Sequence, residues 1–67
     1  MVIIFTQRAH EILFQSQISE DDVAECLLHP QSTYQDGQRH THFVFGAIDV
    51  TALMDGGRRT VIDLAHS

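Results

Sequence analysis

The 67-residue sequence contains no lysine and no tryptophan, and it has one cysteine and one proline. Four arginines stand against nine acidic residues, so the formal net charge is −5 with neutral histidines. A nucleic-acid backbone is normally bound by a basic patch that releases counterions. This charge balance argues against direct nucleic-acid binding and favours a basic protein surface as the partner.

Long apolar runs are also absent from the sequence. No stretch of about 18 apolar residues exists, so we expect no membrane span. The opening segment, Met1–Phe5, is apolar but too short and too poor in basic residues for a signal peptide. The single Cys26 excludes an internal disulfide and fits a reducing compartment, so we expect a cytoplasmic protein.

What is present is typical of one small globular domain. Hydrophobic residues make up 43% of the chain, including four phenylalanines and one tyrosine. No linker, internal repeat or low-complexity segment is visible, so residues 1–67 are interpreted as a single domain. A chain this short buries roughly 60% of the surface that its unfolded form exposes, so its core is small.

The first half of the chain predicts a strand and two helices. The β-branched run Val2–Phe5 predicts a short strand, and Thr6 is suited to cap a helix over residues 7–16. Ser19 predicts the start of a second helix, with Asp22 placed to complete a capping box. Pro30 then ends this helix near His29. The apolar positions expected to face the core are Ala9, Ile12 and Leu13 in the first helix, and Val23, Ala24, Leu27 and Leu28 in the second.

The second half predicts strands that alternate between apolar and polar residues. Turn signals stand at residues 36–37 and 55–57, and Gly46 interrupts the alternation. The residues expected on the inner face are Phe43, Phe45, Ile48, Val50, Ala52, Thr60, Ile62 and Leu64. We therefore expect an α+β fold of the order β-α-α followed by a three- or four-stranded antiparallel meander, with the helices packed on one face of the sheet.

Four of the nine acidic residues gather at the start of the second helix, at positions 20, 21, 22 and 25. Carboxylates in a first helical turn are stabilised by the helix dipole, and this explains Asp22 without a partner. A helical wheel places Asp21, Asp22 and Glu25 outward, opposite the apolar stripe. They form a candidate docking face for a basic partner.

Phe14 falls on the polar side of the first helix, together with Glu11 and away from the apolar face. An exposed aromatic residue on such a face is a candidate interface anchor. The alternative is that the N-terminal strand or residues 31–36 cover the ring. Phe14 and Glu11 are therefore added to the candidate partner-binding residues, and Phe14 or a sheet edge is a candidate homodimer contact.

Several core and capping positions match the pattern of a small bacterial domain family. They are Ala9, Leu13, Ile18, Ser19, Val23, Leu27, Pro30, Asp55-Gly56 and Val61-Ile62. On these positions the chain resembles a family within the RelE-like and barnase-like ribonuclease toxins. The resemblance implies a RelE-like fold and covers nearly the whole chain, but most matched positions specify fold rather than activity.

The resemblance breaks at the family's functional positions. Arg8 stands where the family has a histidine, and Ile12 and Ser16 stand where it has two arginines. RNA cleavage of this kind needs a base for the 2′-hydroxyl proton and cations for the phosphate. Arg8 stays protonated and cannot act as that base. The catalytic set that the resemblance implies is therefore expected to be lost.

His40 and His42 are two residues apart, so they share one face if residues 39–45 form a strand. Together with Arg39, Arg58 and Arg59 they are candidates for a relocated ribonuclease site. The same two histidines are also candidate zinc ligands, if His10, His66 or a carboxylate supplies a third. Cys26 and His29 lie three residues apart on one helix and are a candidate Cys-His nucleophile or metal-binding pair. The alternative is that Cys26 is a buried free cysteine, which is common in proteins.

The sequence thus favours a small, acidic, non-catalytic protein that inhibits a nucleic-acid-handling partner, with no cofactor and no metal. An inhibitor of a CRISPR or restriction effector from a phage or mobile element fits this description, and so does an antitoxin-like inhibitor. The acidic helix would imitate a run of phosphates. The alternatives are a ribonuclease toxin with a rearranged site and a metal-binding accessory protein.

Overall fold

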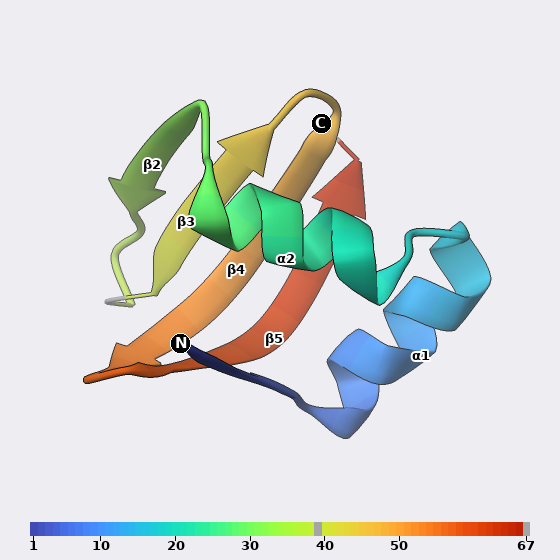
Figure 1. Cartoon of the computed structure of the whole chain (residues 1–67), viewed down its shortest axis with the longest axis horizontal. Coiled ribbons are helices and arrows are strands. Elements are labelled where there is room, and N and C mark those ends of the chain that lie inside the picture. The colour runs from blue at the N-terminus through green and yellow to red at the C-terminus, as the bar shows by residue number, and fades with distance from the viewer. Residues whose placement is uncertain (39, 67) are drawn as a thin grey trace.

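The computed structural model describes residues 1–38 and 40–66 (Figure 1). Within them the chain forms two helices and five strands. Their bounds are β1 Val2–Phe5, α1 Gln7–Ser16, α2 Glu20–Leu28, β2 Ser32–Gln35, β3 Thr41–Phe45, β4 Ile48–Asp55 and β5 Arg58–His66.

The strands form one mixed sheet in the order β1-β5-β4-β3-β2. The strands β2 to β5 pair with antiparallel neighbours, whereas β1 joins the edge in parallel with β5 and places Ile4 beside Thr60. The expected RelE-like arrangement of β-α-α followed by an antiparallel meander of three or four strands is therefore wrong. The fold is a small α+β domain with five strands in a mixed sheet. The sheet is mixed because β1 belongs to it: the N–H groups of Val2 and Thr6 donate to the carbonyl oxygens of Gly57 and Val61, which places β1 parallel to β5.

Both helices begin where the sequence predicts. Thr6 Oγ1 accepts a hydrogen bond from the backbone N–H of Ala9 at 3.2 Å, which caps α1. Ser19 and Asp22 form a complete capping box at the start of α2, with each side chain accepting from the other's backbone N–H. Gln17 ends α1 in a left-handed conformation with φ 59°. The chain can therefore turn directly into α2.

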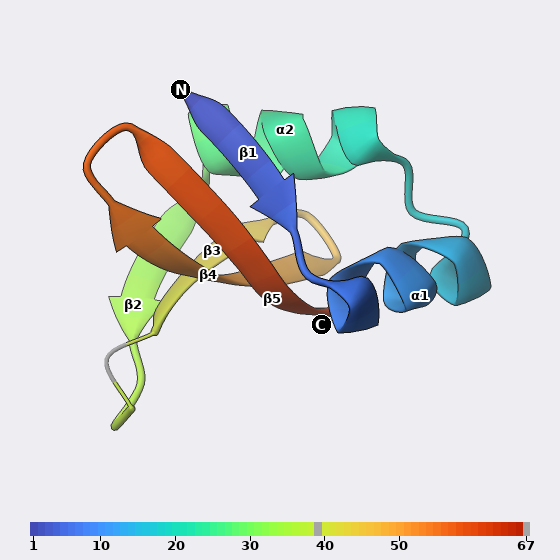
Figure 2. The same ribbon diagram turned by 90° about the horizontal axis from the view of Figure 1, so that it is seen from below.

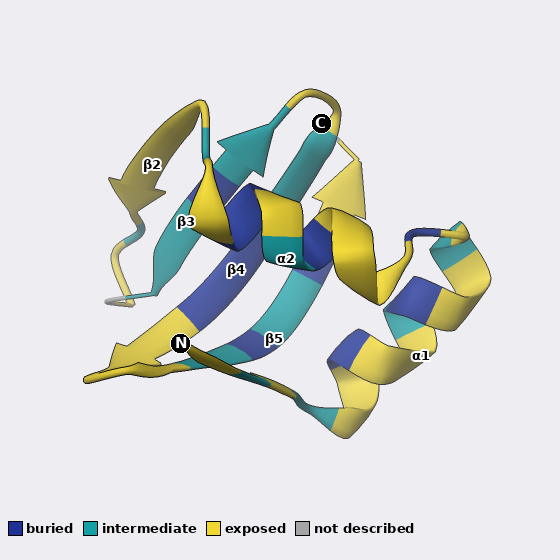
Figure 3. Ribbon diagram, in the orientation of Figure 1, coloured by how far each residue is buried: buried dark blue, intermediate teal, exposed yellow. Residues whose placement is uncertain are grey.

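The core lies between the helices and one face of the sheet (Figures 1 and 3). α2 packs across β3 and β4, and α1 packs against β5 and β1. The buried core residues are Ala9, Leu13, Ile18, Val23, Cys26, Leu27, Phe43, Val50, Ala52, Val61 and Leu64. Figure 2 shows the strongly twisted sheet from below, with both helices to one side of it.

The buried face of α2 differs in part from the predicted stripe. Val23 and Leu27 are buried as expected, and Ala24 is half-buried. Cys26, however, is fully buried, and Leu28 is 56% exposed. Leu28 is the last residue of the helix, and the backbone leaves the helical conformation at His29.

The inner face of β5 also differs from prediction. The register shifts between Thr51 and Ala52, which pair with Asp63 and Val61, so β5 contains one extra residue at a β-bulge. A bulge interrupts the alternation of side chains. Leu64 is buried as expected, and Val61 is buried although it was not predicted to be. Thr60 and Ile62 are only half-buried, so their expected inward positions are wrong.

Candidate functional site

The acidic residues of α2 point into solvent. Asp21, Asp22 and Glu25 are all exposed. Asp22 Oδ2 accepts the Ser19 backbone N–H at 3.2 Å, so its carboxylate is partly used by the cap. Among the described residues, no arginine or histidine forms an ion pair with any of these acids. Asp21 and Glu25 therefore present their charge to the outside.

A groove runs between this acidic face and the β3–β4 turn. Its volume is about 370 Å³, and it is lined by Asp22, Glu25, Phe45, Gly46, Ala47, Ile48 and His66. Phe45 and Ile48 are half-buried and pack against the core. The groove thus has an apolar side made by the strands and a negatively charged side made by α2.

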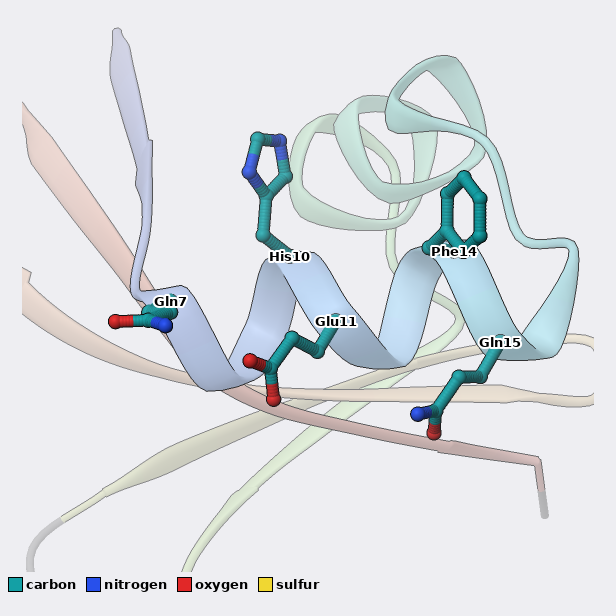
Figure 4. Close-up of a pocket in the computed structure, with 5 residues that line it drawn as sticks. All are labelled: Gln7, His10, Glu11, Phe14 and Gln15. Atoms are coloured by element: carbon teal, nitrogen blue, oxygen red, sulfur yellow. The ribbon is translucent and has the colours of Figure 1, made fainter.

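Phe14 lies on a different surface, the outer face of α1. Its side chain is 90% exposed. Neither β1 nor residues 31–36 cover the ring, so the alternative of a covered Phe14 is wrong. A shallow groove of about 410 Å³ is lined here by Gln7, His10, Glu11, Phe14 and Gln15 (Figure 4). The predicted partner-binding residues therefore lie on two surfaces, one on each helix.

A smaller groove lies between these two surfaces. It measures about 210 Å³ and is lined by His10, Leu13, Phe14, Ile18 and Glu20. Glu20 is the first residue of α2 and is exposed. It places a carboxylate beside the exposed ring of Phe14. The acidic start of α2 and the aromatic residue of α1 are thus neighbours, although Glu11 and Glu25 line separate grooves.

A polar cluster occupies the sheet on β2, β3 and β4. At its centre, His42 Nε2 lies 2.9 Å from Asp36 Oδ2, and His42 Nδ1 lies 3.0 Å from Asp49 Oδ1 and 3.2 Å from Thr51 Oγ1. The ring of Tyr34 stacks on the imidazole at 4.5 Å, with 7° between the planes. The Tyr34 hydroxyl donates to Asp49 Oδ2 at 2.9 Å. Both ring nitrogens of His42 are therefore engaged.

These contacts shift the acidity of the groups that make them. The hydrogen bond to Asp36 raises the pKa of His42, and Asp49 adds to the effect while burial opposes it. The same bond, with the backbone N–H of Gln38, lowers the pKa of Asp36 to about 2. The pKa of Tyr34 is raised because its hydroxyl donates to Asp49. The cluster thus places one imidazole between two carboxylates, and the hydrogen bonds to both favour its protonated form.

His40 joins the cluster only at its border. His40 Nδ1 lies 3.7 Å from Asp36 Oδ2, so both predicted histidines approach one carboxylate. The two arginines are not part of this arrangement. Arg58 is exposed, and Arg59 Nη1 donates to the carbonyl oxygens of Gly56 and Arg58 at 2.8 and 3.2 Å, at the β4–β5 turn. The structure thus brings the histidines together with carboxylates rather than with these cations.

The remaining candidate residues do not form a joint site. Arg39 lies outside the described residues. Within residues 1–38 and 40–66, no group of three or more histidine, cysteine, aspartate and glutamate residues is arranged to hold a metal ion. Cys26 is buried and donates from Sγ to the carbonyl oxygen of Phe43 at 3.2 Å, whereas His29 is exposed. Arg8 Nε lies 3.9 Å from Asp63 Oδ1, in an ion pair that is open to solvent.

Sequence reasoning missed most of the polar cluster around His42. Tyr34, Asp49 and Thr51 were not selected, and Asp36 was noted only as part of a turn. One signal was available, because Tyr34 and Thr51 are the direct neighbours of His42 across the sheet. That signal depends on the pairing register, and the sequence does not supply it.

No protein-family model, no curated protein and no solved structure matches this chain. The resemblance to ribonuclease toxins therefore stays a prediction. Neither described helix is long and apolar enough to cross a membrane.

Proposed function

We propose that this protein is a non-catalytic binding protein that holds a basic surface of a partner protein with the acidic face of α2. The observation that carries the proposal is the groove between α2 and the β3–β4 turn, where Asp22 and Glu25 stand beside Phe45 and Ile48. Asp21 adds a further exposed carboxylate on the same helix.

The chemistry of this groove suits an arginine or lysine side chain. Both carry an aliphatic stem and a charged end, and they bury the stem on apolar surface while the charge stays near water or an acid. Phe45 and Ile48 offer apolar surface for the stem. Glu25 offers a carboxylate that no described cation occupies, and charge-assisted hydrogen bonds to it are stronger than neutral ones.

The partner we infer is a protein that handles nucleic acid, because such proteins expose basic surfaces of this kind. The outward carboxylates of α2 then occupy the place of phosphates, and the bound partner is blocked. An anti-CRISPR, an anti-restriction protein or an antitoxin-like inhibitor would act in this way. The free, buried thiol of Cys26 fits a reducing compartment, and we place the protein in the cytoplasm.

Charge reversal on α2 tests this function. The variant Asp21→Lys with Glu25→Lys changes the formal net charge from −5 to −1, since each substitution adds two units. It leaves the Ser19–Asp22 capping box in place. Wild type and variant are immobilised and used to capture partners from nuclease-treated lysate, and each captured protein is then purified and titrated at low and high salt.

The expected result is a purified basic partner whose affinity falls with rising salt and falls further in the variant, while the denaturant midpoint of the variant changes little. Asp55→Lys with Ser32→Lys and Gln35→Lys, which adds the same four units of charge at exposed positions of β4 and β2, is the control for net charge alone. Equal affinity of wild type and both variants would contradict a role for α2.

A further inference from the structure

The strand β1 forms one edge of the sheet and pairs with β5 on one side only (Figures 1 and 2). Natural proteins protect an exposed edge with charged residues, proline or a bulge. The sequence of β1 is Val2-Ile3-Ile4-Phe5, which contains neither charge nor proline, and the pairing of β1 with β5 is regular. This edge therefore lacks the features that discourage pairing with another strand.

The direction of the backbone groups on β1 follows from two hydrogen bonds. The N–H of Val2 donates to the carbonyl oxygen of Gly57 at 2.8 Å, and the N–H of Thr6 donates to that of Val61 at 3.1 Å. In a parallel pair, alternate residues point their N–H and C=O groups to the same neighbour. Val2, Ile4 and Thr6 thus face β5, and the backbone groups of Ile3 and Phe5 face the free edge.

This spacing is complementary to itself. If a second copy of β1 lies antiparallel across the edge, Ile3 of one copy stands opposite Phe5 of the other, and both exchange N–H···O=C bonds. The two-fold axis then passes between the two Ile4 residues, which form the non-hydrogen-bonded pair where side chains approach closest. Ile4 is 39% exposed and Val2 is 59% exposed, so apolar surface is available for burial along this edge.

The other edge strand, β2, is less suited to the same contact. It is exposed throughout and carries the sequence Ser32-Thr33-Tyr34-Gln35. Its side chains are polar except for the Tyr34 ring, which already stacks on His42. Pairing two copies at β2 would also place Asp36, which directly follows this strand, at the end of the contact in each copy. Apolar burial favours β1, and charge disfavours β2.

We propose that the protein forms a symmetric homodimer by antiparallel pairing of β1 with β1 of a second copy, which extends the sheet across the two-fold axis. The inference is independent of the proposed function, because β1 and the acidic face of α2 share no residue. The contact is short, so we expect weak association in which the dimer forms only as the protein concentration rises. Each copy carries a net charge of −5. The copies repel each other, and salt is expected to strengthen the dimer, whereas it weakens binding to a basic partner.

The test is sedimentation equilibrium of the purified full chain over a wide concentration range at low and high salt, combined with amide hydrogen exchange. Wild type is expected to approach the mass of two chains as concentration rises, and sooner at high salt. Exchange at the Ile3 and Phe5 amides should slow with concentration. Exchange at Thr33 and Gln35 on the β2 edge should not.

A matched pair of variants at Ile3 isolates the backbone contact. Ile3→Pro removes an N–H that faces the free edge and leaves the bonds from β1 to β5 intact. Ile3→Val leaves three side-chain carbons, the same number as in proline, but keeps the N–H. We expect the dimer dissociation constant to rise about tenfold more in Ile3→Pro than in Ile3→Val, because each Ile3→Pro dimer loses two hydrogen bonds.

A second pair tests the two-fold axis and does not depend on proline. Ile4→Glu places two like charges opposite each other at the axis and should abolish the dimer. Leu53→Glu introduces the same charge on β4 at a similarly exposed position, 43% against 39%, and should leave the dimer in place. A wild-type protein that stays monomeric at every concentration and salt, or a dimer that survives Ile4→Glu, would overturn the proposal.

Discussion

His42 Nε2 lies 2.9 Å from Asp36 Oδ2, and this contact joins the second residue of β3 to the residue that follows β2. Every residue of β2 is exposed, so burial does little to hold this strand. Tyr34 adds a second tie, because its hydroxyl donates to Asp49 on β4. The edge strand β2 is therefore held by its backbone pairing with β3 and by hydrogen bonds of the polar cluster, which depend on the protonation of His42.

The first prediction is a pH dependence of stability that originates at His42. Its pKa is raised in the folded state, mainly by Asp36. The contribution of protonated His42 to the free energy of unfolding is complete below the unfolded pKa of about 6.5, and it is lost as pH rises through the raised folded pKa. The pKa of Asp36 is lowered to about 2. The contribution of ionised Asp36 to the free energy of unfolding is complete above the unfolded pKa of about 3.9, and it is lost as pH falls towards the lowered folded pKa of about 2.

The cluster thus stabilises the fold most between about pH 4 and pH 6.5. Urea melts at mildly acidic and mildly alkaline pH should show the greater stability on the acidic side of this comparison. His42→Gln should flatten the difference, whereas the exposed His66→Gln should keep it. An equally large difference in wild type and His42→Gln would assign the effect to another group.

The second prediction concerns the start of α2. Asp22 N donates to Ser19 Oγ at 3.1 Å, and Ser19→Ala removes this acceptor. The free energy of unfolding should fall by about 0.5–2 kcal/mol, and the melting temperature by about 4–8 °C for each kcal/mol in a domain of this size. Thermal and urea melts measure both. Ser32→Ala, on the exposed β2, should change stability by less than about 0.5 kcal/mol.

The third prediction compares two adjacent glycines in the β4–β5 turn. Gly56 has a φ of 58°, whereas Gly57 is not among the residues with positive φ. A Cβ would meet no atom within 4 Å at either position. Gly56→Ala should therefore cost about 1–2 kcal/mol through its backbone conformation alone, and Gly57→Ala should cost less. Equal losses in urea melts would contradict this backbone explanation.

The fourth prediction concerns the reactivity of Cys26. Burial, and then the charge of Asp49, raise the pKa of its thiol. Because the thiolate is the nucleophile, the folded protein should react slowly with a thiol-specific reagent at neutral pH, and the unfolded protein should react at the rate of a free cysteine. Labelling is followed against urea concentration. A fast reaction in the absence of urea would show that the thiol is accessible in the folded state.

Features that depend on neighbouring residues were predictable from the sequence. The caps at Thr6 and Ser19 each join residues three positions apart, and the turn at Gly56 needs one residue that tolerates positive φ. The outward position of Asp21 and Glu25 follows from the helical period. In each case the physical cause acts within about one helical turn or one β-turn, so the local sequence is sufficient.

Other features were decided by contacts between distant parts of the chain. The parallel pairing of β1 with β5 joins the two ends of the sequence, and the bulge opposite Thr51 depends on how β5 fits the core. The pairing register brings Tyr34 and Thr51 to His42. Strand order and register are set by the burial of the whole core and not by any one segment. The sequence by itself therefore determined the helices, their caps and the outward acids, and only the tertiary structure decided the mixed sheet and the His42 cluster.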